Sequence, residues 1–125
     1  MNPESTRAHI SALRIPVTGP AEHIRLHPGG TPGFLTDLYR VIDTQVVEAV
    51  TLTGRWHAWV DEEGARRPVN HAATAIAHDC GMSATLHGTV ILTGFHPRSG
   101  RARSLSPAQL DAIGRRLASR SQASR

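Results

Sequence analysis

Two apolar segments separated by only two turn residues constrain this chain more than any other feature. The segments "VVEAVTL" (residues 46–52) and "RWHAWV" (residues 55–60) are rich in β-branched and aromatic residues, and Thr53-Gly54 lies between them. Strands joined by so short a gap pair in opposite directions as a β-hairpin. Any sheet that this chain builds is therefore expected to be antiparallel at least here.

Three further segments have the pattern of strands. In "ISALRIPV" (residues 10–17) apolar side chains alternate, and Pro16, which has no N–H to donate, should lie at a sheet edge or end the strand. "HIRL" (residues 23–26) follows a turn signal, and "GTVILTGF" (residues 88–95) is bounded by glycines. Together with the hairpin, these segments predict five strands.

Each of three predicted helices begins at a capping residue. Thr31 precedes a proline, which suits the first helical position, and Asn70 precedes "HAATAIAHDC". Ser106 and Gln109 form a capping box at the start of the last helix. The order of elements is ββαββαβα. We therefore predict an α+β fold with a mostly antiparallel five-stranded sheet and helices packed mainly on one face.

The length and composition fit one domain without a membrane segment. The 125 residues are expected to form a single domain over residues 9–119, with a flexible N-terminus at 1–8 and a disordered basic tail at 120–125. No apolar run approaches the roughly 18 residues of a membrane helix, and the N-terminus lacks a secretory pattern. The single Cys excludes an internal disulfide framework, which fits a reducing cytoplasm. We therefore expect a cytoplasmic protein, and the lack of a long apolar run leads us to expect no membrane partner.

The basic residues other than histidine are all arginine, fourteen in number, and the formal net charge is +4. Guanidinium groups pair with phosphate and carboxylate, so this composition suits an anionic partner such as a nucleic acid. A GC-rich genome favours Arg codons and explains the same composition without such a partner. Arg115 and Arg116 near the end of the last helix are candidates for weak, sequence-independent nucleic-acid binding.

The stretch "VDEEGARRPVN" (residues 60–70) contains three consecutive carboxylates. Paired carboxylates can act as general acid and base or hold a hard cation. Consecutive side chains at a strand end point in different directions, however, and rarely converge on one atom. We therefore interpret the stretch as a strand end, a turn and a helix cap, and keep Asp61, Glu62 and Arg67 as candidate binding residues.

Asn70 is predicted to cap the second helix, because its side-chain oxygen can accept from a backbone N–H two or three residues on. A ligand contact at the same helix N-terminus is an alternative that the sequence leaves open. If Asn70 acts only as a cap, Asn70→Ala should cost about 1 kcal/mol. Asn70→Asp should be nearly neutral, because Asp also caps and suits a helix N-terminus.

Neither the eight histidines nor the single cysteine forms a catalytic or metal motif. His71 and His78 are seven residues apart on one predicted helix, about 10 Å, which is too far for one ion to bridge. Cys80 is expected to be a small buried hydrophobe, and no nucleotide-binding or hydrolase signature is present. We expect no catalytic residues, no cofactor and no metal.

The two tryptophans should point to opposite faces of one strand, because Trp56 and Trp59 are three residues apart. Ala58 and Val60 mark the Trp56 face as the core side. The opposite face would carry Trp59 together with Arg55, His57, Ile91, Thr93 and Phe95. If the helices cover only the core side, this second face is an exposed platform; if one helix crosses over, it is buried. We predict that Trp59 anchors a contact with a partner protein or a second copy.

Four segments occur in an order and spacing that resemble one known family: "ALRIPVTGP", "WVDEEGARRPVNHAATAIA", "GTVILTG" and "SLSPAQ". The family is catalogued as domain of unknown function 3846. The most specific part of the resemblance is an acid-Glu-Gly turn, a Pro-x-Asn and an Ala-Thr helix, carried here by Asp61, Glu62, Gly64, Pro68, Asn70, Ala73 and Thr74. The resemblance implies a cytoplasmic accessory protein of a phage, plasmid or other mobile element, and it carries over no catalytic residue. Relatives often have Gly after the first helix, where Asp43-Thr44 stands here.

Three functions compete on these observations. The first is a non-enzymatic binding module that acts on a partner protein or on itself as a homodimer. The second is a nucleic-acid or nucleotide binder that uses arginines and an open sheet face, and the third is a small hydrolase, for which no motif argues. We rank them in this order. The candidate binding residues are Arg55, His57, Trp59, Asp61, Glu62, Arg67, Asn70, Arg115 and Arg116.

Overall fold

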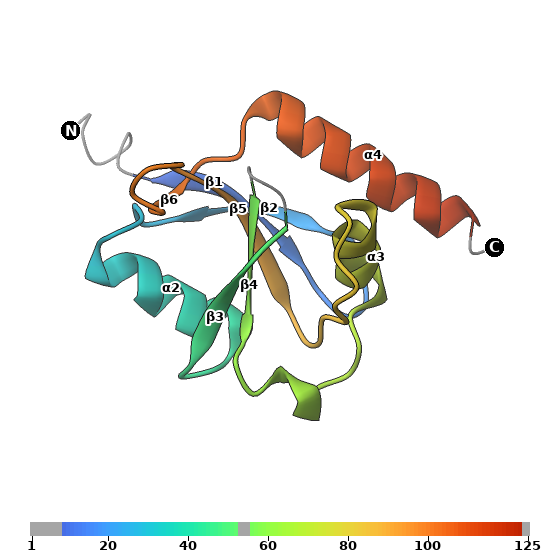
Figure 1. The fold of residues 1–125 in the computed structure, drawn as a ribbon, viewed down its shortest axis with the longest axis horizontal. Helices are drawn as coiled ribbons and strands as arrows, with labels where there is room; N and C mark the ends of the chain where they lie inside the picture. The colour runs from blue at the N-terminus through green and yellow to red at the C-terminus, as the bar shows by residue number, and fades with distance from the viewer. Residues whose placement is uncertain (1–8, 53–55, 124–125) are drawn as a thin grey trace.

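The structure of the protein, a computed structural model, describes residues 9–52 and 56–123. Its centre is a sheet in the order β2-β1-β5-β4-β3, in which all neighbouring strands are antiparallel (Figure 1). The strands are β1 (Ile10–Ile15), β2 (Glu22–Leu26), β3 (Val47–Thr51), β4 (Trp56–Asp61) and β5 (Val90–Phe95). The predicted fold class, element order and antiparallel sheet are confirmed.

The strand boundaries follow the local chemistry of the sequence. β1 ends directly before Pro16, as expected for a residue without a backbone N–H. β3 and β4 pair from Val47 opposite Asp61 to Thr51 opposite His57. The Thr53-Gly54 turn of this hairpin lies outside the described residues.

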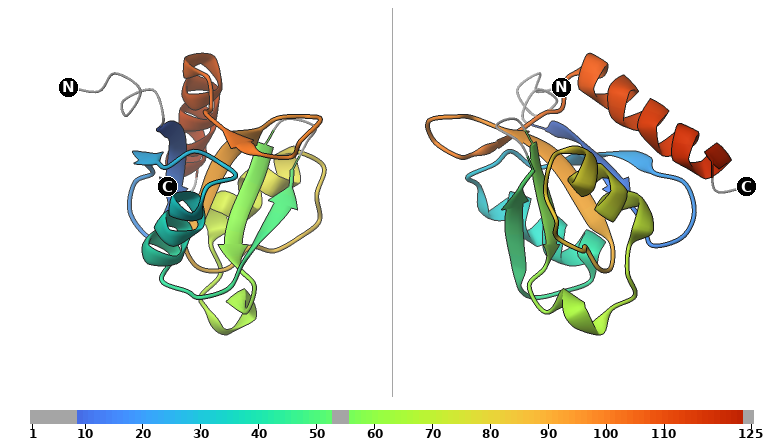
Figure 2. Two further views of the ribbon diagram at one scale, coloured as in Figure 1. Left: turned by 90° about the vertical axis from the view of Figure 1, so that its left-hand side faces the viewer. Right: turned by 45° about the vertical axis from the view of Figure 1, so that its right-hand side comes forward.

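Helices cover both faces of the sheet, which gives three layers (Figure 2). α3 (His71–Asp79) and α4 (Pro107–Ala123) pack on one face, and α2 (Pro32–Ile42) packs on the other. α2 connects β2 and β3, which form opposite edges of the sheet, and it therefore crosses over β5 and β4. Two of the three helices, α3 and α4, therefore share one face of the sheet. The third helix, α2, covers the opposite face, which would be exposed if all helices packed on one side.

The course of α2 corrects the expectation of an open platform around Trp59. The apolar stripe of α2, formed by Phe34, Leu38 and Ile42, is buried against this face of the sheet. Ile91 and Thr93 of β5 are fully buried beneath it. The physical reason is that an amphipathic helix which must span the sheet from edge to edge buries its apolar stripe on the way.

Both ends of α2 depart from the simplest capping pattern. Thr31 occupies the N-cap position and Pro32 the first turn as predicted, but the Thr31 hydroxyl donates to the Pro28 carbonyl at 2.6 Å and makes no cap to the helix. At the other end Asp43 adopts a left-handed conformation with φ 62°, and its N–H bonds to the Tyr39 carbonyl. This is the position at which glycine is favoured, because glycine adopts positive φ without steric cost.

Asn70 caps α3 as predicted, and it also does more. Its Oδ1 accepts from the Ala73 N–H at 3.0 Å, while its Nδ2 donates to the carbonyls of Ile15 at 2.9 Å and Gly88 at 2.8 Å. The side chain is 0% exposed. Asn70 therefore links α3 to the end of β1 and to Gly88, in the segment just before β5. The expectation of a nearly neutral Asn70→Asp must be revised, because Asp offers no N–H group for the two donations.

The C-terminal part contains one predicted helix and one unpredicted strand. The Ser106–Gln109 capping box is confirmed, with reciprocal backbone-to-side-chain bonds of 2.8 and 3.1 Å. α4 runs on to Ala123, into the segment expected to be a disordered tail, where no Gly or Pro interrupts the helix. β6 (Ala102–Arg103), which is not among the five predicted strands, pairs with the end of β5. Within the described ranges, no helix combines the length and apolarity that crossing a bilayer requires.

Candidate functional site

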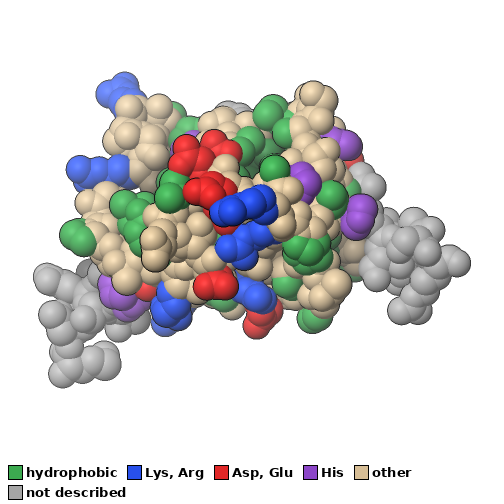
Figure 3. Space-filling model, turned by 90° about the horizontal axis from the view of Figure 1, so that it is seen from below, with side chains coloured by type: hydrophobic (Ala, Val, Ile, Leu, Met, Phe, Trp, Pro, Cys, Tyr) green, Lys and Arg blue, Asp and Glu red, His purple; other side chains and the backbone are tan. Residues whose placement is uncertain are grey.

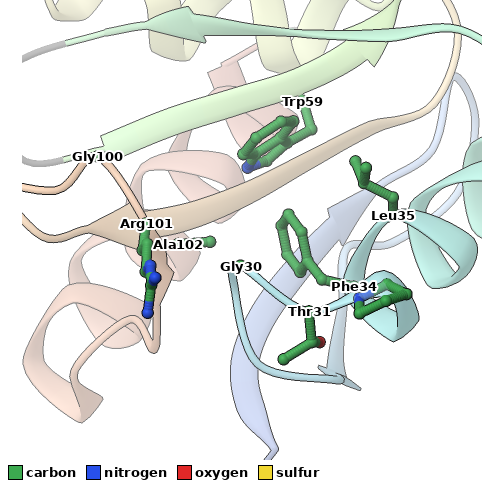
Figure 4. Close-up of a pocket in the computed structure, with 9 residues that line it drawn as sticks. Gly30, Thr31, Phe34, Leu35, Trp59, Gly100, Arg101 and Ala102 are labelled. Atoms are coloured by element: carbon green, nitrogen blue, oxygen red, sulfur yellow. The ribbon is translucent and has the colours of Figure 1, made fainter.

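A groove of about 570 Å³ lies between α2, β4 and the β5–β6 hairpin (Figure 4). We call it the α2 groove. It is lined by Gly30 and Thr31 before α2, by Pro32, Phe34 and Leu35 of α2, by Trp59 of β4, and by Gly100, Arg101 and Ala102 of the hairpin. Its volume falls in the range of roughly 300–1,000 Å³ that is usual for ligand pockets, and its lining is mostly apolar.

Trp59 is held rigidly in the wall of this groove. Its indole N–H donates to the Thr93 hydroxyl on the neighbouring strand at 2.9 Å. The Phe34 ring packs edge-on against it, with ring centroids 5.2 Å apart and an interplanar angle of 77°. Because both contacts fix a half-buried ring, Trp59 offers apolar surface to a ligand with little conformational freedom left to lose.

The aromatic contacts continue from Trp59 along the same face of the sheet. The His57 ring lies edge-on to Trp59 at 5.8 Å and stacks on Phe95 at 3.9 Å. Burial lowers the pKa of His57, so the imidazole is uncharged at neutral pH. Within the described residues its Nδ1 atom is buried without a hydrogen-bond partner. The rings of His57 and Phe95 therefore extend the apolar surface that begins at Trp59.

Two glycines allow the loop before α2 to pack directly on the hairpin. A Cβ on Gly29 would lie 2.5 Å from the Ala102 carbonyl oxygen, and one on Gly30 would lie 2.9 Å from the Arg101 Nε. The Gly29 contact is with backbone and leaves no room for a larger residue, whereas the Gly30 contact is with the flexible Arg101 side chain and Gly30 is favoured by its φ of 80°. The Arg101 side chain lies across Gly30 at the end of the groove.

The β5–β6 hairpin carries three arginines without carboxylate partners. In the described part of the chain, Arg98, Arg101 and Arg103 form no ion pair. Arginines elsewhere do find such partners, for example Arg14 with Glu22 at 2.6 Å. The end of the α2 groove therefore has unneutralised positive charge beside an apolar lining.

α2 also presents exposed apolar side chains at the rim of the groove. Leu35 is 40% exposed and lines the groove, and Tyr39, one turn further along the helix, is 36% exposed. Val46, before β3, is also 40% exposed but is no part of the lining. These three are the large hydrophobic residues with the greatest exposure in the described ranges.

A buried acid in the middle of α2 anchors this helix and so positions the groove wall. The Asp37 carboxylate accepts from the His27 backbone N–H at 2.8 Å, and its other oxygen pairs with Arg40 at 3.2 Å. The His27 ring lies 2.8 Å from the same carboxylate. Although burial by itself would raise the pKa of Asp37, these partners hold it below its usual value. The contacts fasten α2 to the end of β2.

The acidic turn does not belong to this groove. Asp61 is buried, accepts from the Glu63 N–H at 2.8 Å and pairs with the Arg67 Nε at 2.7 Å, while Glu62 is exposed. Burial favours protonation of Asp61, but its hydrogen bonds keep its pKa below the usual range. Arg67 also donates to the Asp43 carbonyl. The ion pair between Asp61 and Arg67 thus stabilises the strand end and the turn. Figure 3 shows acidic and basic side chains side by side on one face of the molecule.

Of the other predicted site residues, none meets the groove. Asn70 is in the interior, where all its side-chain hydrogen-bonding groups have protein partners. Arg116 pairs with Asp79 at 3.4 Å and links α4 to α3, and Arg115 is exposed on α4. Arg55 lies outside the described residues. Only His57 and Trp59, from the set predicted by sequence, come together beside the α2 groove.

The remaining candidates for chemistry are Cys80 and the histidines. Burial raises the pKa of the Cys80 thiol; Arg116 opposes this effect and Asp79 reinforces it. The thiol is therefore protonated at neutral pH and is a poor nucleophile. In the part of the chain that the structure describes, no three His, Cys, Asp or Glu side chains are placed to share a metal ion.

The sequence did not identify Phe34, Leu35 or Arg101 as site residues. Phe34 has the spacing of a core residue, which it also is, and Leu35 is its exposed neighbour. For Arg101 one signal was available, since the Gly-Gly pair at 29–30 indicates close approach of another segment. The sequence could not show that this segment is the hairpin.

Comparison with known proteins identifies one family. The family model described as domain of unknown function (DUF3846) matches residues 10–118, which confirms the resemblance seen in the sequence. No curated protein and no solved structure matches the chain significantly.

Proposed function

The chain belongs to the domain of unknown function 3846 family, and we propose that it is a non-enzymatic binding module whose α2 groove takes an apolar segment of a partner protein. The proposal keeps the setting that the family resemblance implied, an accessory protein of a mobile element that acts in the cytoplasm. A homodimer, in which a second copy supplies the segment, is the competing occupant. Residues of the groove, and not the acidic turn or Asn70, are assigned to binding.

The observation that carries this proposal is the fixed, half-buried Trp59 in the wall of an apolar groove. Binding hot spots are enriched in Trp, Tyr and Arg, and they lie in well-packed pockets. The groove combines Trp59 with Arg101, and Tyr39 is exposed one helical turn beyond the lining residue Leu35. Exposed apolar side chains next to a groove are typical of a surface that contacts another protein.

The chemistry of the lining supports binding over catalysis. Arg101 cannot act as a general acid or base, because its guanidinium does not lose a proton in proteins. The Thr31 hydroxyl donates to the Pro28 carbonyl, and the Trp59 indole is bonded to Thr93. No lining residue is a carboxylate, a histidine or a cysteine. The groove therefore offers apolar contact and one positive charge, which suit recognition.

A single-stranded nucleic acid is the second candidate ligand, because three arginines lie on the hairpin beside Phe95. Proteins that bind single strands stack bases on aromatic faces. Here His57 and Phe95 stack on each other, so one face of each ring is already occupied. We therefore rank a protein segment first.

A matched pair of variants tests the proposal. Peptides of twelve residues are selected from a displayed random library on the wild-type protein, and their Kd is measured by fluorescence anisotropy. Leu35→Ser should weaken binding by about tenfold or more, which corresponds to about 1.4 kcal/mol. Val46→Ser should change Kd less than about twofold, because Val46 has the same 40% exposure but lies outside the groove. Equal effects of the two substitutions would reject the groove as the site.

A further inference from the structure

We infer that the segment bound in the α2 groove is acidic, with a carboxylate next to its apolar side chain, and that Arg101 selects it. The inference rests on the proposed function, because it names the chemistry of the partner at the same groove. It concerns a residue that neither the sequence pattern nor the family assigns. Four observations lead to it: the position of Arg101, the charge of the hairpin, the apolar lining around Arg101, and the presence of a single arginine in that lining.

The first observation is that Arg101 lies at the end of the groove (Figure 4). The side chain lies against Gly30, whose added Cβ would come within 2.9 Å of Nε and 3.1 Å of Cδ. The backbone is fixed, since the Arg101 carbonyl accepts from the His96 N–H at 2.8 Å. The Arg101 side chain is exposed, so its guanidinium is accessible to a partner.

The second observation is the charge of the hairpin. Arg98, Arg101 and Arg103 form no ion pair with described residues; the same holds for Arg25 and Arg115, whereas five other described arginines pair with carboxylates. The partner therefore meets a region of one sign. A guanidinium presents its N–H groups in a planar fork that matches both oxygens of a carboxylate.

The third observation is that Arg101 lines the groove together with Trp59, Phe34 and Ala102. The Arg101 side chain is exposed, so a carboxylate bound to it would form a partly solvated pair whose attraction weakens with salt. The apolar walls of the groove hold the neighbouring apolar side chain of the partner. Recognition of an apolar and an anionic group side by side follows from this arrangement.

The fourth observation favours a peptide carboxylate over the phosphates of a nucleic acid. The only arginine in the groove lining is Arg101, whereas a nucleic-acid strand presents a phosphate at every nucleotide. Phe34 is buried, and the His57 and Phe95 rings stack on each other. An acidic, apolar peptide uses the groove and its single arginine without requiring an open aromatic platform.

The test uses two capped probe peptides that differ only in charge, Ac-Ser-Asp-Leu-Phe-Asp-Ser-NH2 and its isostere with Asn in place of both Asp residues. Kd values are measured by competition against a labelled copy of the acidic peptide, at low salt and at about 200 mM salt. Each is measured with wild type, Arg101→Met and Arg98→Met. Methionine keeps an apolar stem without the charge, and Arg98 is a control on the same hairpin but outside the lining.

The inference predicts that wild type binds the acidic peptide about fivefold more tightly than the Asn peptide, with a smaller preference at high salt. Arg101→Met should remove the preference and leave the Kd of the Asn peptide within about twofold, whereas Arg98→Met should retain most of it. Equal binding of both peptides to wild type would overturn the inference and leave the proposed function standing. No binding of either peptide would overturn both. Tighter binding of a twelve-residue oligo-dT, lost in Arg101→Met, would assign the groove to nucleic acid instead.

Discussion

Asn70→Asp is the substitution for which sequence and structure make opposite predictions. The Asp side chain keeps an oxygen for the cap to the Ala73 N–H, which is 3.0 Å from Oδ1 in wild type. It loses both donations from Nδ2, to the carbonyls of Ile15 and Gly88. It also brings a second oxygen towards those two carbonyl oxygens in a site that is 0% exposed. The substitution therefore changes the electrostatics of the site strongly, although it hardly changes the shape of the side chain.

The magnitude follows from the separate contributions. Two lost hydrogen bonds cost about 2 kcal/mol, and a buried acceptor left without a donor adds roughly 1–3 kcal/mol. We expect Asn70→Asp to lower the free energy of unfolding by about 3–5 kcal/mol at pH 7. Asn70→Ala loses the cap, about 1 kcal/mol, and leaves the two carbonyls unpaired, for a total of about 3 kcal/mol.

Urea denaturation monitored by circular dichroism measures these differences. Ser106→Asp is the control, because Ser106 also caps a helix but has no buried donor role, and it should stay within about 0.5 kcal/mol of wild type. The deficit of Asn70→Asp should shrink at about pH 4, because a protonated carboxyl can donate one hydrogen bond. If Asn70→Asp matches wild type at pH 7, the capping contact alone accounts for Asn70 and the two donations carry no weight.

Three further predictions concern individual side chains. Asp43→Gly should raise the free energy of unfolding by about 1 kcal/mol, measured by urea denaturation, because Asp43 has φ 62° and glycine adopts this conformation without steric cost. Asp61 has a pKa below its ordinary 3.8, so its ion pair stabilises the fold at neutral pH and is lost as pH falls below that value. Asp61→Asn should therefore unfold more readily at pH 7 and show a flatter dependence of stability on pH between about 5 and 2. Trp59→Ala should lower the thermal midpoint, because it removes the contact with Phe34 and the bond to Thr93, and light scattering should show whether it also changes the oligomeric state.

Local sequence signals predicted most of the elements because their causes are local. Pro16 ends β1, and the Ser106–Gln109 box starts α4, within a few residues of the signal itself. The alternation around Ala58 and Val60 correctly placed Trp56 and Trp59 on opposite faces. The two-residue β6 was missed, because its pairing with β5 depends on the hairpin and not on a strand pattern of its own.

The candidate site was harder to predict because its causes are tertiary. Trp59 was identified from its place on the strand, but the groove exists only because α2 crosses from β2 to β3. Arg101 comes to the groove through its contact with Gly30, seventy-one positions earlier in the chain. The donor role of Asn70 was missed for the same reason, since the Ile15 carbonyl is 55 residues away.

The indole N–H resonance of Trp59 tests the central claim most directly. In a ¹⁵N-labelled sample the only other indole resonance belongs to Trp56, which packs on the opposite face of the sheet and serves as an internal control. On titration with the acidic probe peptide, the Trp59 resonance should move and saturate with the Kd measured by competition, while the Trp56 resonance should stay within its line width. Saturable binding that moves the Trp56 resonance, or neither resonance, would contradict the assignment of the α2 groove as the binding site.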